Sequence, residues 1–113
     1  LTADGATLVV GSPREDSAAQ GLDGDQANDA ASNAGAAYRF AYDGAQWRQG
    51  TYVKADNSES ADFFGYGCAI GGPGPSMVVG ALFESSAATG VGGDALDNTA
   101  TYAGAVYVVE LGP

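Results

Sequence analysis

The sequence contains no histidine, a single cysteine (Cys68) and only four lysine and arginine residues among 113. The lack of histidine removes the commonest general base and the usual zinc ligand. One cysteine excludes an internal disulfide, and without a histidine to act as its base Cys68 is expected to be a small buried hydrophobe. No apolar run approaches the ~20 residues that a helix needs to span a bilayer.

The shortage of cations also limits the classes of partner. Fourteen acidic residues give a net charge of −10, and nucleic-acid binding needs lysine and arginine to neutralise phosphates. The sequence contains neither a nucleophile elbow nor a phosphate-binding loop, and no pair of carboxylates is marked for acid–base chemistry. We therefore expect no nucleic-acid partner and no enzymatic activity.

What the sequence does contain is glycine and alternating polarity. Eighteen glycines argue against a helical bundle, because glycine is costly inside a helix. Asp4-Gly5 and Asp43-Gly44 are typical of tight hairpin turns. Segments that alternate in polarity or are rich in β-branched residues predict strands, so the expected fold class is all-β. The predicted strands are residues 7–11, 36–42, 46–54, 64–70, 77–81 and 105–111.

The chain repeats itself with a period of 69 residues. Shifted by this amount, residues 8–40 align with residues 77–109 without a gap, and 15 of the 33 aligned pairs are identical. The matches include Val9-Val10-Gly11 with Val78-Val79-Gly80, and Ala34-Gly35-Ala36 with Ala103-Gly104-Ala105. The chain is therefore predicted to contain two copies of one structural unit.

Up-and-down sheets repeated at a fixed period are typical of a β-propeller. If the strands of a four-stranded antiparallel blade are named A to D, the chain supplies the end of A, then B, C and D, and then A, B and C of the next blade. The predicted blades are residues 1–54 and 63–113, joined by a link at 55–62, and both have long B–C loops. Since propellers typically need 4–8 blades, we expect either neighbouring blades in a longer chain or self-association.

Phe64-Gly65 followed by Gly80-Ala81 resembles the motif of the FG-GAP, or integrin alpha-type, β-propeller family. Gly11-Ser12-Pro13 stands where that motif has Gly-Ala-Pro, although Leu82 replaces the proline in the second unit. Residues 34–40 and 103–109 are similar to the family's Gly-Ala-Val-Tyr-Val-Phe strand, and residues 21–25 are similar to the Gly-x-x-Gly-Asp stretch of its bacterial extracellular members. The resemblance implies a secreted or cell-surface location and a role in adhesion or binding.

One family feature is missing. Many members hold calcium in an Asp-x-Asp-x-Asp-Gly loop between strands A and B, but here those connections contain only Asp4. Calcium needs six to eight oxygen ligands, so this metal site is not expected. The B–C loops offer another candidate calcium site, in which the ligands would be Asp23, Asp25, Asp29, Asp94, Asp97 and Asn98. The alternative is that these residues cap turns and keep the loops soluble.

The acids are distributed unequally between the two ends of the predicted blades. Antiparallel strands place the B–C loops and the inter-blade link on one face, which carries 11 of the 14 acids. The resemblance implies that this face binds ligand, and long loops on a rigid scaffold are the usual place for function. The candidate ligand-binding residues are Asp23, Asp25, Asp29, Asp56, Asp62, Asp94 and Asp97.

Three functions remain open. The first is an extracellular recognition module that presents its acidic face to a protein partner. The second is a carbohydrate-binding propeller, for which Trp47, Tyr42 and Tyr52 could form a stacking surface, although aromatics at strand spacing also fill the space between blades. The third is a purely structural repeat of a large surface protein.

Overall fold

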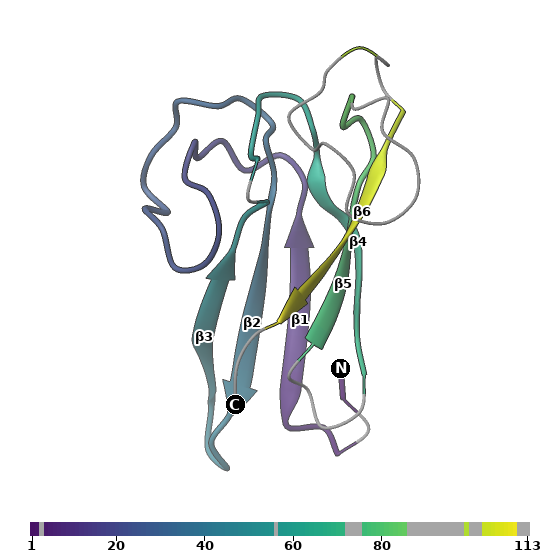
Figure 1. Ribbon diagram of the computed structural model, residues 1–113. Coiled ribbons are helices and arrows are strands. Elements are labelled where there is room, and N and C mark those ends of the chain that lie inside the picture. Colours follow the sequence, from purple (N-terminus) through teal and green to yellow (C-terminus); the bar gives the residue numbers. More distant parts are fainter. Residues whose placement is uncertain (3, 56, 72–75, 86–98, 100–102, 111–113) are drawn as a thin grey trace.

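In the described part of the chain, six strands form two antiparallel sheets of three strands each, joined in up-and-down order (Figure 1). The computed structural model describes residues 1–2, 4–55, 57–71, 76–85, 99 and 103–110. Sheet 1 has the order β1-β2-β3 and sheet 2 the order β4-β5-β6. The strands are β1 (Thr7–Ser12), β2 (Ala36–Tyr42), β3 (Trp47–Val53), β4 (Phe64–Ile70), β5 (Ser76–Ala81) and β6 (Ala105–Glu110).

The all-β class and the positions of the strands are confirmed. Within the described residues each sheet has three strands, and neither has a fourth. The expected end of a strand before β1 is not formed there: Gly5 N–H donates to the Thr2 carbonyl and Thr2 N–H to that of Thr7. The Asp43-Gly44 hairpin turn is present, with Gly44 at φ 95°. None of the elements in the described part of the chain is a helix long and apolar enough to span a membrane.

The 69-residue repeat is preserved in the strand pairing. The pairs from Thr7↔Ala41 to Ser12↔Ala36 in β1–β2 become, after adding 69, the pairs from Ser76↔Glu110 to Ala81↔Ala105 in β5–β6. The backbone before the second strand of each pair is also the same. Gly35 and Gly104 have φ of 88° and 86°. Their N–H groups donate to the backbone carbonyls of Glu15 and Glu84, which are themselves 69 residues apart.

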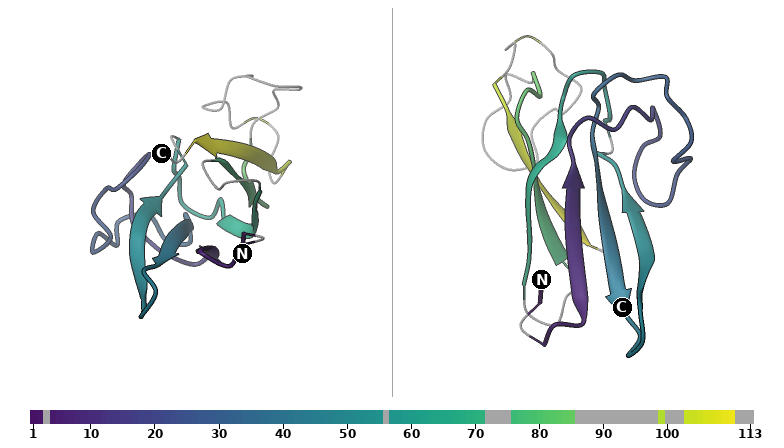
Figure 2. Two further views of the ribbon diagram at one scale, coloured as in Figure 1. Left: turned by 90° about the horizontal axis from the view of Figure 1, so that it is seen from below. Right: turned by 180° about the vertical axis from the view of Figure 1, so that it is seen from behind.

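The core lies between the two sheets. β1 and β4 lie side by side (Figures 1 and 2), and the buried residues come from facing sides of both sheets. The core consists of Val9, Ala37, Val53, Ala55, Phe64, Met77, Val79 and Ala81. Cys68 packs against this cluster but is only half-buried, less than expected, and burial raises the pKa of its thiol.

The sheets are joined where Phe64-Gly65 crosses Gly11 and Gly35. Phe64 pairs in parallel with Gly35 through an isolated bridge, and its N–H donates to the Ala34 carbonyl at 3.0 Å. A Cβ added to Gly11 would overlap the Gly65 carbonyl oxygen, and one added to Gly35 would overlap the Phe64 backbone. The two sheets can therefore approach this closely only because both positions lack a side chain.

The repeat provides a matched pair of variants that tests this junction. Gly11→Ala should lower the free energy of unfolding by about 1–3 kcal/mol, the usual cost of overpacking, because the Gly65 backbone must move. Gly80→Ala is the control, since the added Cβ would have only the Gly67 carbonyl oxygen nearby, at 3.8 Å. Urea unfolding measures both, and an equal loss in the two variants would contradict the junction.

Candidate functional site

The long connections gather at one end of the sheets, which we call the loop end (Figure 1). It consists of residues 13–35, 54–63 and 82–85 in the described part of the chain. Hydrogen bonds join the segments: Ala61 N–H donates to the Ser32 carbonyl at 2.8 Å, and Phe83 N–H to that of Asp62 at 3.2 Å. The loops thus form one continuous surface.

Residues 13–35 are attached to the outer edge of β3. Leu22 forms a bridge with Val53, and Lys54 N–H donates to the Gly21 carbonyl at 2.9 Å. Asp23 contributes twice, because its N–H donates to the Tyr52 carbonyl and its carboxylate accepts from Tyr52 N–H at 3.0 Å. The loop therefore covers part of a strand edge that would otherwise be exposed.

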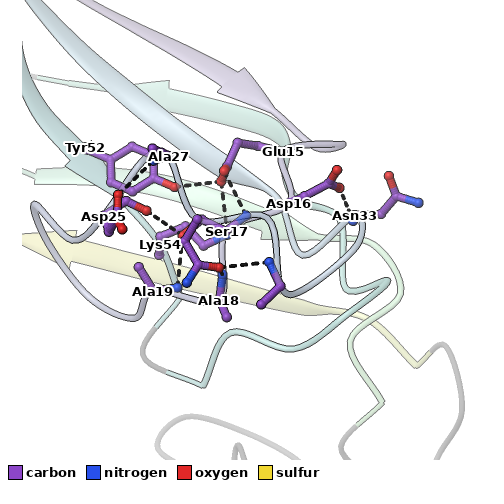
Figure 3. A network of polar contacts seen from close by, with 12 residues as sticks. Glu15, Asp16, Ser17, Ala18, Ala19, Asp25, Ala27, Asn33, Tyr52 and Lys54 are labelled. Carbon is purple, nitrogen blue, oxygen red and sulfur yellow. Dashed lines mark hydrogen bonds and ion pairs between the residues drawn. The ribbon is translucent and has the colours of Figure 1, made fainter.

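The Glu15 carboxylate is the centre of a polar network beneath this loop (Figure 3). One of its oxygens accepts from Tyr52 Oη at 2.6 Å and from Lys54 Nζ at 3.1 Å, and the other accepts from Ser17 N–H at 2.8 Å. The Lys54 side chain is fully buried, and burial lowers the pKa of its ammonium group although Glu15 opposes that shift. Burial, followed by the bond to Glu15, raises the pKa of Tyr52. The network fixes the start of the loop from inside.

The candidate ligand-binding acids differ in what they contact. Asp23 and Asp25 are exposed, but each also accepts a hydrogen bond from a backbone N–H, that of Tyr52 for Asp23 and that of Ala27 for Asp25. Asp29 is exposed on the same loop. Asp62 is only 7% exposed, so its carboxyl contributes little to the outer surface. Asp56, Asp94 and Asp97 lie outside the described residues.

Asp62 is an unusual carboxyl. One of its oxygens is buried without a hydrogen-bond partner. Burial, reinforced by the nearby charges of Glu59 and Glu84, raises its pKa from 3.8 to about 7. The loop end thus contains one acid that holds its proton well above the usual range.

The candidate calcium ligands do not meet in the described part of the chain. No group of three or more acidic or cysteine side chains within it is arranged to hold a metal ion. Asp23, Asp25 and Asp29 therefore do not form such a site with one another. Asp94, Asp97 and Asn98 lie outside the described residues.

The aromatic residues considered for sugar stacking are separated. Tyr52 is buried at the loop end, whereas Tyr42 and Trp47 form a cross-strand pair at the opposite, hairpin end of sheet 1. Their ring centroids are 5.2 Å apart, and both are more than 40% exposed. The three rings do not form one surface.

Sequence patterns did not single out the Glu15–Tyr52–Lys54 network. Its members are up to 39 residues apart, and nothing local marks a buried ion pair. One signal was present, because Glu15 and Glu84 are identical at the 69-residue spacing. Both contribute a backbone carbonyl at equivalent positions, and Glu84 is only 2% exposed.

Comparisons with protein-family models, curated proteins and solved structures found no match to this chain. Its role is therefore inferred from its own geometry. Two features of that geometry matter most, namely the fixed, acidic loop end and the close junction between the sheets.

Because the Glu15–Lys54 ion pair is buried, we expect a nearly isosteric substitution in it to lower the free energy of unfolding strongly. Glu15→Gln removes the charge opposite Lys54 and should lower the free energy of unfolding by about 3–5 kcal/mol, because an unpaired charge stays buried. Asp43→Asn, which removes the exposed pair with Arg48, should cost less than about 1 kcal/mol. Urea unfolding compares them, and similar losses would rule out a special role for Glu15.

The raised pKa of Asp62 predicts a pH dependence of stability. The folded state binds this proton more tightly than the unfolded chain does. The resulting contribution to the free energy of unfolding is therefore complete below pH 3.8 and is lost as the pH rises through about 7. Asp62→Asn stays neutral at all pH values. When the pH is raised, its free energy of unfolding should therefore fall less than that of the unchanged chain. Urea midpoints at about pH 5 and about pH 8 measure this difference. The same pH dependence in both proteins would refute it.

Proposed function

We propose that this chain is part of a β-propeller of the FG-GAP kind and acts as a non-catalytic extracellular module that presents its loop end to a protein partner. The observation that carries the proposal is the repeat, because β1–β2 and β5–β6 pair in the same register after a shift of 69 residues. Up-and-down sheets related in this way are the units from which propellers are built.

The glycine junction supports the same architecture. The Phe-Gly pair that begins one sheet packs on Gly11 within β1 and on Gly35 just before β2 of the sheet before it. This contact joins successive units and uses the residues on which the resemblance to the FG-GAP family depends. It gives Gly11, Gly35 and Gly65 a physical reason.

The loop end supports recognition of a partner. Its loop is fixed from below by Glu15, Tyr52 and Lys54, so a partner would lose little free energy in ordering it. Asp23, Asp25 and Asp29 remain exposed above this base. An exposed acidic surface attracts a basic partner, and rim charges of this kind make association sensitive to salt.

A structural repeat without a ligand is the second candidate. It is favoured by the hydrogen bonds through which Asp23 and Asp25 hold their own loop. Replacement of an aspartate by asparagine separates the two candidates, because the amide keeps an oxygen that can accept the backbone N–H but removes the charge.

The test uses an array of synthetic peptides graded in lysine and arginine content, measured at low and at raised salt. We expect basic peptides to bind, binding to weaken with salt, and the Asp23→Asn/Asp25→Asn/Asp29→Asn variant to bind several-fold more weakly. The control, Asp4→Asn/Asp43→Asn, removes two charges remote from the loop end and should keep its binding. Equal losses of peptide binding in the two variants would show that only the net charge matters. No binding of peptides by the unchanged chain would favour the structural repeat.

A further inference from the structure

Sheet 2 carries an open groove whose second and third strands correspond in position to the place where Phe64-Gly65 lies on sheet 1. The groove is lined by Tyr66, Gly67, Gly80–Leu82 and residues 103–106. Subtracting 69 from the last two segments gives residues 11–13 and 34–37, which include the two glycines in close contact with Phe64-Gly65. We propose that this groove binds an extended Phe-Gly strand supplied by a further repeat unit.

The backbone of the groove already has the bound shape. Gly104 has φ 86° and its N–H donates to the Glu84 carbonyl at 2.7 Å, while Gly35 in the filled site has φ 88° and donates to Glu15 at 2.8 Å. Glu84 N–H donates to the Ala81 carbonyl as Glu15 N–H does to that of Ser12. The Ala103 carbonyl is the counterpart of the Ala34 carbonyl that accepts from Phe64 N–H.

The apolar face beside the groove lacks the cover that its counterpart has. In sheet 1, Val9 and Ala37 are 9% and 0% exposed because sheet 2 lies on them. The equivalent residues of sheet 2, Val78 and Val106, are 44% and 71% exposed. A unit that placed its phenylalanine against this face would bury these side chains, which favours association.

The occupant must begin with a sequence like that of residues 62–65. Gly65 has φ 93°, and a Cβ there would overlap the Ala36 carbonyl oxygen, so a glycine is required. Phe64 is 1% exposed and lies in the shared core, so the aromatic ring contributes the apolar contact. A second copy of this chain cannot supply the strand without releasing its own, because its Phe64-Gly65 is already bound.

This inference depends on the repeat architecture of the proposed function but not on the loop end. The probe is a fluorescein-labelled peptide with the sequence of residues 61–70, in which Cys68→Ser prevents disulfide formation. Fluorescence polarisation should show saturable binding to the chain. Peptides with Gly65→Ala or Phe64→Ala should bind at least about tenfold more weakly, a loss of ~1.4 kcal/mol or more.

The matched chain variants are Gly80→Ala and Gly71→Ala. Gly80→Ala places a methyl group where the peptide must approach, yet its Cβ would meet only the Gly67 carbonyl oxygen at 3.8 Å, so the fold should be kept. It should weaken binding at least about tenfold. Gly71 lies outside the groove with open space around it, and Gly71→Ala should bind as the unchanged chain does.

Three outcomes would overturn the proposal: no saturable binding, equal binding by Gly80→Ala, or self-association in light scattering that is lost in Gly80→Ala and that excludes the peptide. The last would identify a second copy as the occupant. Binding by the Asp23→Asn/Asp25→Asn/Asp29→Asn variant separates this inference from the proposed function. This variant should bind the peptide of residues 61–70 as the unchanged chain does, even if the loop end binds nothing.

Discussion

The contact on which the rest of the structure depends is the backbone approach of Phe64-Gly65 to Gly11 and Gly35. No side chain fits between these segments, so the two sheets meet at a fixed distance and the core residues on their facing sides are buried. The same contact also positions the loop end, because Phe63 N–H and Phe64 N–H donate to the carbonyls of Asn33 and Ala34 at the end of the first long loop. Fold and candidate surface thus depend on one junction.

The loop end combines two kinds of acid with different physical roles. Glu15 and Asp62 are largely buried, one paired with Lys54 and the other protonated well above its usual pH range, and both shape the base of the loops. Asp23, Asp25 and Asp29 are exposed to solvent. A net charge of −10 therefore does not describe the surface directly, since only the exposed acids contribute their charge to it.

The strands could be predicted because their signals are local: alternation in residues 36–42 and the Asp-Gly turns depend on near neighbours in the sequence. The register follows the repeat, since positions 69 apart occupy equivalent pairs. The Glu15–Lys54 pair and the burial of Asp62 could not be predicted, because both depend on where distant loops meet in space. The end of a strand that was expected before β1 is not formed, because Thr2 and Gly5 make local hydrogen bonds instead.

The most direct measurement of the junction is native-state hydrogen exchange at the amides of Phe63 and Phe64. If the glycine contact couples the sheets, these amides exchange only when the whole chain unfolds, with the same free energy as the amides of β1 and β5. If the sheets are independent units, Phe63 and Phe64 exchange through a local opening of much lower free energy while both sheets stay protected. That result would contradict the central role of the junction.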